Sequence, residues 1–188
     1  PLVRRITEHA YRAGASLVTT LIGDDVSTLM RYRYAPDESF DKASGWLFEG
    51  MAKAFQNGAA RLAVVGDDPN LLSGQDPDKV ARANRARSIA YQPALELIAG
   101  FATNWSILSC STPAWARTVF PGEEESVAVA KLWDAIFRSS RVDGADPIAD
   151  WAQHNRNLAA RTALLNGKRF AALHFKGPGT DLTVGLAD

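Results

Sequence analysis

The chain has 188 residues, 46% of them hydrophobic, and its 21 basic side chains balance its 21 acidic ones. This length and composition predict one globular domain with a sizeable core. The formal net charge of zero argues against a nucleic-acid-binding protein or an anchor to anionic membranes, because both need an excess of basic side chains.

The first part of the chain alternates helical and strand patterns. Apolar residues at helical spacing predict a helix from Leu2 to Ala13. The short β-branched run ASLVTTLI at 15 to 22 predicts a buried strand. The same order recurs, because the apolar stripe from Phe48 to Phe55 predicts a helix and ARLAVVGDD at 60 to 68 predicts a second buried strand.

The middle of the chain continues this alternation. Asp76-Pro77 can cap and start a helix that Gly100 would end, although Pro93 should kink or divide it. The run TNWSILSC at 103 to 110 predicts a third strand. The segment from 123 to 141 has acids in its first turn and arginines in its last, which favours a helix through its macrodipole.

The last part of the chain predicts a helix followed by a hairpin. The helix would start at Asp146-Pro147 and end near Asn166-Gly167. Polar and apolar residues then alternate on both sides of the turn Gly177-Pro178-Gly179, which predicts two strands with one buried face. Because the pattern reaches Asp188 without a further element, we expect a second domain to follow it.

Three buried strands separated by helices predict an α/β fold, a mostly parallel sheet with helices on both faces in a Rossmann-like three-layer arrangement. Parallel strands need long crossovers, which are usually right-handed helices. The terminal hairpin would either form an antiparallel edge of this sheet or belong to the start of the following domain. We therefore predict an α/β domain at 1 to 168 and a linking hairpin at 169 to 188.

Metal-ligating spacing is absent from the sequence. His9, His154 and His174 lie in three separate predicted elements, and a metal needs clustered ligands, so we expect surface histidines. The acidic pairs Asp24-Asp25 and Asp67-Asp68 follow predicted strands, where we expect them to cap helices and form turns.

Three further motifs have simple structural interpretations. Glu123 to Glu125 would be stabilised by the free amides of a helix N-terminus rather than act as a general acid and base. Cys110, the sole cysteine, has no identifiable partner histidine, so we expect a buried inert thiol. The segment VVGDDPN at 64 to 70 lacks the spaced glycines of a dinucleotide site.

The segment STPAWA at 111 to 116 is the one predicted loop that favours a functional site. It follows the third predicted strand, where an α/β domain lines a cleft. Thr112, Pro113 and Trp115 could form a wall of a substrate cavity, with Trp115 offering a large apolar surface. Trp115 could equally fill the gap to another domain. The remaining tryptophans are expected in the core or a domain interface, and they are Trp46, Trp105, Trp133 and Trp151.

Several segments of the sequence resemble those of a known protein family. The stretch RFAALHFKGPGTDLTVGLAD at 169 to 188 resembles the segment that links the two domains of the family M29 metallo-aminopeptidases, also called the thermophilic aminopeptidase family. The resemblance continues in VRRITEHAYRAGAS at 3 to 16, RYAP at 33 to 36 and STPAWA at 111 to 116.

This resemblance implies a role for the chain within a larger enzyme. The family removes N-terminal residues from peptides with two divalent metals of the Zn, Co or Mn class, held by ligands that all follow the GTDLTVGL stretch. The resemblance therefore implies no catalytic or metal-binding residue in this segment, which would be an inactive scaffold and cavity domain. It also implies two partners, a C-terminal catalytic domain and a second copy in a homodimer.

The alternative from another class is a stand-alone α/β module that binds a ligand or partner without catalysis. An unfinished hairpin and an exposed apolar patch would distinguish a fragment from such a module. The single cysteine favours a reducing, cytoplasmic setting. No apolar run approaches the roughly 20 residues that span a bilayer, so we expect no membrane partner.

Overall fold

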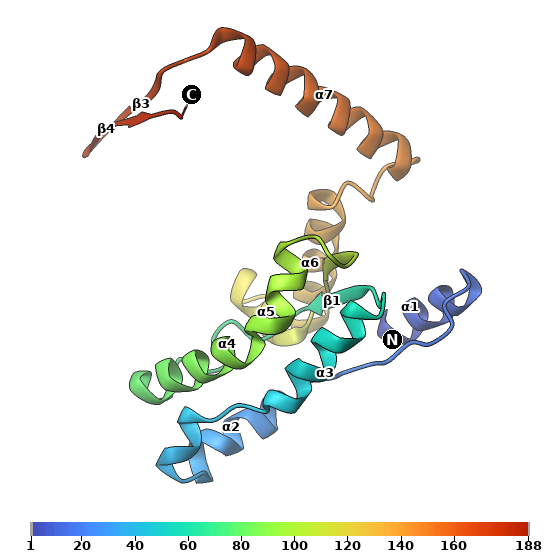
Figure 1. The fold of residues 1–188 in the computed structure, drawn as a ribbon, viewed down its shortest axis with the longest axis vertical. Helices are drawn as coiled ribbons and strands as arrows, with labels where there is room; N and C mark the ends of the chain where they lie inside the picture. The colour runs from blue at the N-terminus through green and yellow to red at the C-terminus, as the bar shows by residue number, and fades with distance from the viewer. Residues whose placement is uncertain (1, 188) are drawn as a thin grey trace. The chain divides into compact units, whose positions relative to one another are not determined.

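The computed structural model describes residues 2 to 187, and its contacts divide the chain into two compact units (Figure 1). The first unit ends at Ile136 and the second begins at Phe137. This boundary lies inside helix α6, Glu125–Ser139, which contributes to both units. The predicted boundary between 168 and 169 stays a prediction. No helix among the described residues is long and apolar enough to cross a membrane.

The helices of the first unit include all those predicted for this region. They are α1 (Leu2–Arg12), α2 (Asp25–Tyr34), the 3-10 helix η1 (Asp37–Asp41), α3 (Gly45–Gln56), α4 (Pro77–Ala99), α5 (Pro113–Val119) and α6. Helices α2, η1 and α5, which are short, were not predicted from the sequence. Short helices have few turns over which an apolar period can be recognised.

Two of these helices begin where their capping residues predict. The side chain of Asp24 accepts a 2.8 Å hydrogen bond from the amide of Ser27, and Asp76 accepts one of 2.9 Å from the amide of Asp78. Both carboxylates thereby satisfy amides that have no partner inside the helix. α4 continues through Pro93 to its C-cap Gly100, so the predicted division at the proline does not occur.

Strand β1, Arg61–Val65, pairs in parallel with β2, Trp105–Ser109. The register places Arg61 opposite Trp105 and Val65 opposite Ser109. Helix α4 lies between the two strands in sequence, as a parallel crossover requires. The second and third predicted strands are therefore confirmed as strands, and with them a mixed α/β fold. Their predicted burial is wrong, because Leu62 in β1 is 45% exposed and Ile107 in β2 is 53% exposed.

The first predicted strand, at 15 to 22, is wrong. This segment is irregular, and Leu17 and Ile22 are 76% and 82% exposed. A strand requires a hydrogen-bonded neighbour, and no strand among residues 2 to 187 pairs with this segment. The described sheet consequently has two parallel strands, which do not make the predicted three-layer arrangement.

The core of the first unit consists of two apolar clusters. One joins α3 to α4 through Ala52, Phe55, Ala94 and Ile98. The other joins α5 to α6 through Ala116, Ala128, Leu132 and Ile136. Trp46, at 75% exposure, lies outside the core of this chain, so its prediction as a core residue is wrong and its place in a domain interface stays a prediction.

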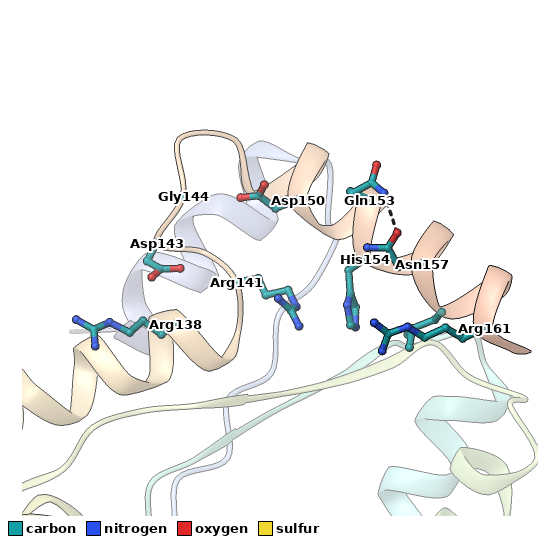
Figure 2. A pocket seen from close by; sticks show the side chains of 10 residues that line it. Arg138, Arg141, Asp143, Gly144, Asp150, Gln153, His154, Asn157 and Arg161 are labelled. Carbon is teal, nitrogen blue, oxygen red and sulfur yellow. Dashed lines mark hydrogen bonds between the residues drawn. The ribbon is translucent and has the colours of Figure 1, made fainter.

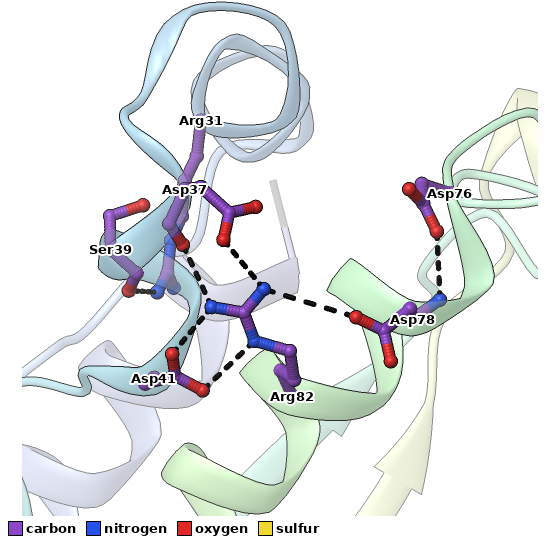
Figure 3. A network of polar contacts seen from close by, with 7 residues as sticks. All are labelled: Arg31, Asp37, Ser39, Asp41, Asp76, Asp78 and Arg82. Atoms are coloured by element: carbon purple, nitrogen blue, oxygen red, sulfur yellow. Dashed lines mark hydrogen bonds and ion pairs between the residues drawn. The ribbon is translucent and has the colours of Figure 1, made fainter.

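A network centred on Arg82 joins η1 to α4 (Figure 3). Its guanidinium donates to Asp37 at 2.8 Å and to both carboxylate oxygens of Asp41, at 3.0 and 2.5 Å. The hydrogen bond from Arg82 lowers the pKa of Asp41, and the bonds to Asp41 and Asp37 raise the pKa of Arg82. Arg31 of α2 also reaches this region, where it donates to the carbonyl oxygen of Ser39 at 2.5 Å.

The second unit contains α7, Pro147–Lys168, and an antiparallel hairpin of β3, Ala172–Gly177, and β4, Thr180–Gly185. Asp146 caps α7 by accepting a 3.0 Å hydrogen bond from the amide of Ala149. The predicted helix and hairpin are both confirmed. Among the described residues the hairpin strands pair only with each other, so the expectation that they form an edge of the parallel sheet is wrong.

The hairpin has one apolar and one polar face. Leu173 lies opposite Val184 and Phe175 lies opposite Leu182, so that the four side chains share a face. These side chains are 42% to 52% exposed. The predicted alternation of apolar and polar side chains is confirmed. The predicted burial of the apolar face does not occur within residues 2 to 187.

Candidate functional site

The two parallel strands end side by side, and the residues that follow them form the candidate site. The amide of Cys110 donates a 2.7 Å hydrogen bond to the carbonyl oxygen of Val65, which extends the pairing beyond β2. Parallel strands present their carboxyl ends at one edge of a sheet, where α/β proteins commonly bind ligands. The loop after β1 and the segment 110 to 112 therefore become neighbours.

Thr112 connects these two strand ends. Its hydroxyl donates a 2.6 Å hydrogen bond to the carbonyl oxygen of Gly66 and accepts one of 3.4 Å from the amide of Trp115. Thr112 is thus the N-cap of α5, with Pro113 at the first helical position. The predicted loop at 111 to 116 is wrong from Pro113 onward, where α5 begins, and the Thr-Pro pair was the sequence signal for this helix start.

Gly66 allows the strand ends to approach closely. A Cβ atom at this position would lie 2.4 Å from the carbonyl oxygen of Cys110 and 3.0 Å from Cγ2 of Thr112. Any side chain would force the two segments apart. The role of Gly66 was not predicted, although a glycine at the end of a strand is a recognisable sign of close backbone approach.

Trp115 is half-buried and packs against the cluster of α5 and α6. Ser111 strengthens the same contact, because its hydroxyl donates a 3.0 Å hydrogen bond to the carbonyl oxygen of Val129 in α6. The structure therefore brings the predicted residues Thr112, Pro113 and Trp115 together on one short, anchored helix. The part of the indole that remains exposed can offer an apolar surface to a ligand.

The acidic residues near this edge have structural roles. Asp68 accepts a 2.9 Å hydrogen bond from the amide of Asn70, which confirms it as a turn former. Glu124 accepts hydrogen bonds from the amides of Ser126, at 3.0 Å, and Val127, at 3.2 Å. The hydroxyl and amide of Ser126 lower the pKa of Glu124. The helix N-terminus interpretation is thereby confirmed for this residue.

Cys110 is half-buried rather than buried, so its predicted burial is wrong. Its Sγ atom lies 3.6 Å from the carbonyl oxygen of Ser111, in hydrogen-bond contact. A thiol needs an adjacent base to act as a nucleophile at neutral pH. The contact shown here is with a backbone oxygen and supplies no base.

The three histidines belong to three different elements. His9 is exposed on α1, His154 packs edge-on against Trp151 with ring centroids 5.5 Å apart, and His174 lies 2.7 Å from the carboxylate of Asp181. Within residues 2 to 187, no three His, Cys, Asp or Glu side chains are grouped so that they could hold a metal ion. The described residues thus do not fit a metal centre.

A separate cavity lies wholly within the second unit (Figure 2). Its volume is about 510 Å³. The end of α6, the loop after it and the part of α7 from Asp150 to Arg161 form its walls. This cavity was not predicted from the sequence, because its polar residues are spread over 24 positions from Arg138 to Arg161 without a recognisable motif.

Comparisons with known proteins match this chain along its length. The family model described as thermophilic metalloprotease (M29) matches residues 1–188. Aminopeptidase T of Thermus thermophilus is 56% identical over 186 residues, which cover 99% of this chain and 46% of that protein. Aminopeptidase AmpS of Bacillus subtilis is 36% identical over 98% of this chain and 45% of its own length.

A solved structure gives the same result for the fold. The structure described as wild-type AmpT from Thermus thermophilus superposes with a TM-score of 0.90 and 55% sequence identity. The match covers 98% of this chain and 45% of that one. The chain therefore spans slightly less than half the length of the relatives it matches.

Proposed function

The chain belongs to the M29 family of thermophilic metalloproteases, and from this premise we propose that it is the N-terminal scaffold and substrate-cavity domain of a metal-dependent aminopeptidase. The observation that carries the proposal is the family match over the whole chain, together with relatives named aminopeptidases of which it spans 46%. On this proposal, the metal ligands lie in the other part of the full-length protein, and residues 1 to 188 alone are inactive.

The proposed cavity wall consists of Thr112, Pro113 and Trp115. Helix α5 is anchored on one side by the cluster with α6 and on the other by the hydrogen bond from Thr112 to Gly66. A side chain carried by such an anchored element has little freedom to move, so it can limit the size of a bound peptide. Trp115 would contact the substrate, and Thr112 would hold Trp115 in position.

The hairpin supports the scaffold role. Its exposed face of Leu173, Phe175, Leu182 and Val184 is contiguous across both strands. Such a face is costly to leave in water, which favours a partner surface that covers it. We assign that surface to the C-terminal catalytic domain of the same protein.

The proposal extends to the setting of the full-length enzyme. It would act on peptides in the cytoplasm, as a homodimer, with two divalent ions of the Zn, Co or Mn class. The lone cysteine supports a reducing compartment, because secreted domains of this size commonly carry disulfides. Sedimentation of the full-length protein and metal analysis of the purified enzyme test the dimer and the metals.

The function is tested by comparing the full-length protein with the 188-residue chain on aminoacyl p-nitroanilides, with added Zn²⁺, Co²⁺ or Mn²⁺. We expect hydrolysis by the full-length protein only. Hydrolysis by the shorter chain would contradict the scaffold assignment. No hydrolysis by the full-length protein with any of the three metals would contradict the peptidase assignment and favour a binding module.

The cavity wall is tested by Trp115→Ala in the full-length enzyme. We expect the Michaelis constant or the preferred peptide length to change, with kcat on the smallest substrate retained. Trp46→Ala, at a tryptophan that is 75% exposed and distant in sequence from α5, is the matched control. The substrates are peptides of about two to six residues. Unchanged kinetics for Trp115→Ala across this series would show that Trp115 does not form part of the wall.

A further inference from the structure

Guanidinium groups and side-chain amides line the cavity of the second unit. Its polar lining consists of Arg138, Arg141, Asp143, Asp150, Gln153, His154, Asn157 and Arg161. Figure 2 shows Arg141, His154 and Arg161 pointing into a common space, whereas the guanidinium of Arg138 points away from it. The lining as a whole carries three arginines and two aspartates.

The arginines of the cavity have no carboxylate partner in the described chain. Within residues 2 to 187, neither Arg141 nor Arg161 forms an ion pair, and neither guanidinium donates a hydrogen bond. Arg82 shows the contrasting case, because its guanidinium is occupied by Asp37 and Asp41. The donors of Arg141 and Arg161 are therefore available to a ligand.

Asp150 leaves these donors available for a geometric reason. The carboxylate of Asp150 lies against the loop, where a Cβ at Gly144 would be 2.3 Å from its Oδ2 atom. Figure 2 places Asp150 and Gly144 on the side of the cavity away from Arg161. Asp150 and Arg161 thus occupy different walls, whereas Asp143 lies on the same loop as Arg141 without forming an ion pair with it within residues 2 to 187.

The wall that carries Arg141 is fixed to α7. The indole nitrogen of Trp151 donates a 2.9 Å hydrogen bond to the carbonyl oxygen of Ser140, and the cap at Asp146 fixes the start of the helix. On α7 itself, the amide of Gln153 donates to Asn157 at 2.9 Å. The lining is therefore held by contacts that do not depend on a ligand.

We propose that this cavity binds an oxyanion, the carboxylate or phosphate group of a small ligand. A guanidinium matches both groups because its donors can bind two oxygens at once. Asn157, whose side-chain NH₂ is not used in its hydrogen bond with Gln153, can add a neutral donor. A volume of about 510 Å³ leaves room for the body of a ligand beyond the anion, within the range of small-molecule sites. The proposal is independent of the peptidase function.

The test is calorimetric titration of the full-length protein with three probes: inorganic phosphate, an N-acetylated tripeptide with a free C-terminal carboxylate, and the same tripeptide as its C-terminal amide. The acetyl group prevents removal of the first residue by an aminopeptidase. We expect phosphate or the free-acid peptide to bind and the amide not to bind. Phosphate binding alone identifies a phosphate ligand, and peptide binding that requires the carboxylate identifies a carboxylate ligand.

Arg141→Gln and Arg161→Gln are each expected to weaken that binding by about tenfold or more. Lys168→Gln, at the last residue of α7 and outside the cavity, removes the same charge and is expected to leave binding unchanged. If a glutamine variant fails to fold, anion binding is measured for Arg161→Lys instead. This variant retains the positive charge but lacks the forked donors of a guanidinium, so it should also bind more weakly. Absence of binding by both anions, or equal binding by wild type and the arginine variants, overturns the proposal.

Discussion

The hydroxyl of Thr112 and the carbonyl oxygen of Gly66 lie 2.6 Å apart and join the end of β1 to the start of α5. The same hydroxyl caps α5, since it accepts from the amide of Trp115. One side chain therefore closes the parallel strand pair and sets the position of the tryptophan that we propose as a cavity wall. Loss of this hydroxyl should affect both the stability of the first unit and the order of α5.

Thr112→Val should lower the free energy of unfolding by about 1 to 2 kcal/mol, because valine retains the shape and loses both hydrogen bonds. Urea unfolding followed by tryptophan fluorescence measures the change. Thr112→Ser keeps the hydroxyl and should retain most of the stability. Equal stability of the valine variant and wild type would show that neither bond contributes.

Gly66→Ala should destabilise the first unit by about 1 to 3 kcal/mol, in the range of overpacked sites. The added Cβ would lie 2.4 Å from the carbonyl oxygen of Cys110, so the strand ends must separate. Gly50→Ala in α3, where no atom lies within 4 Å of an added Cβ, is the control and should be neutral or stabilising by up to about 1 kcal/mol. A smaller effect at Gly66 than at Gly50 would contradict the close approach.

The pairing of Asp41 with Arg82 should make stability depend on pH in acid. Because the hydrogen bond from Arg82 lowers the pKa of Asp41 below its ordinary value, the carboxylate stabilises the folded state above that value and ceases to do so as the pH falls through the lowered pKa. Arg82 has a raised pKa, remains charged throughout this range and adds no pH dependence.

Thermal melts between about pH 2 and 6 should consequently show a shallower acid loss for Asp41→Asn than for wild type. The asparagine variant should also melt several degrees lower near neutral pH. Glu38→Gln, on the same helix η1, should keep the wild-type slope. Parallel pH profiles for wild type and Asp41→Asn would show that the pair does not couple protonation to folding.

Leu132→Ala should cost about 2 to 5 kcal/mol of unfolding free energy, because Leu132 is 3% exposed at the centre of the cluster between α5 and α6. Val127→Ala on the same helix, at 41% exposure, should cost less than about 1 kcal/mol. Urea denaturation of both variants measures the difference. Similar values would indicate that the cluster is not the core of this region.

The hairpin shows how far local sequence can predict structure. Its strands, its turn and its alternating faces were predicted from residues 169 to 188 alone, because each signal depends on neighbours in the chain. The caps at Asp76 and Asp146 are local in the same sense, since each carboxylate binds an amide two or three residues away. The family was also recognised from contiguous segments, for the same reason.

The sequence by itself therefore determined the long helices, two parallel strands, the hairpin and the family of this protein, all of which depend on short stretches of residues. Only the tertiary structure decided that the strand-like run at 15 to 22 has no partner among the described residues, and that Thr112 bonds to Gly66, 46 positions away. It also decided which arginines are paired: Arg82 binds Asp41 at a separation of 41 residues, whereas Arg141 and Arg161 face an open cavity. The physical reason is that the packing of distant segments determines which groups are hydrogen-bonded, buried or left as unpaired charges. A periodic pattern in the sequence indicates only that one face of an element is apolar.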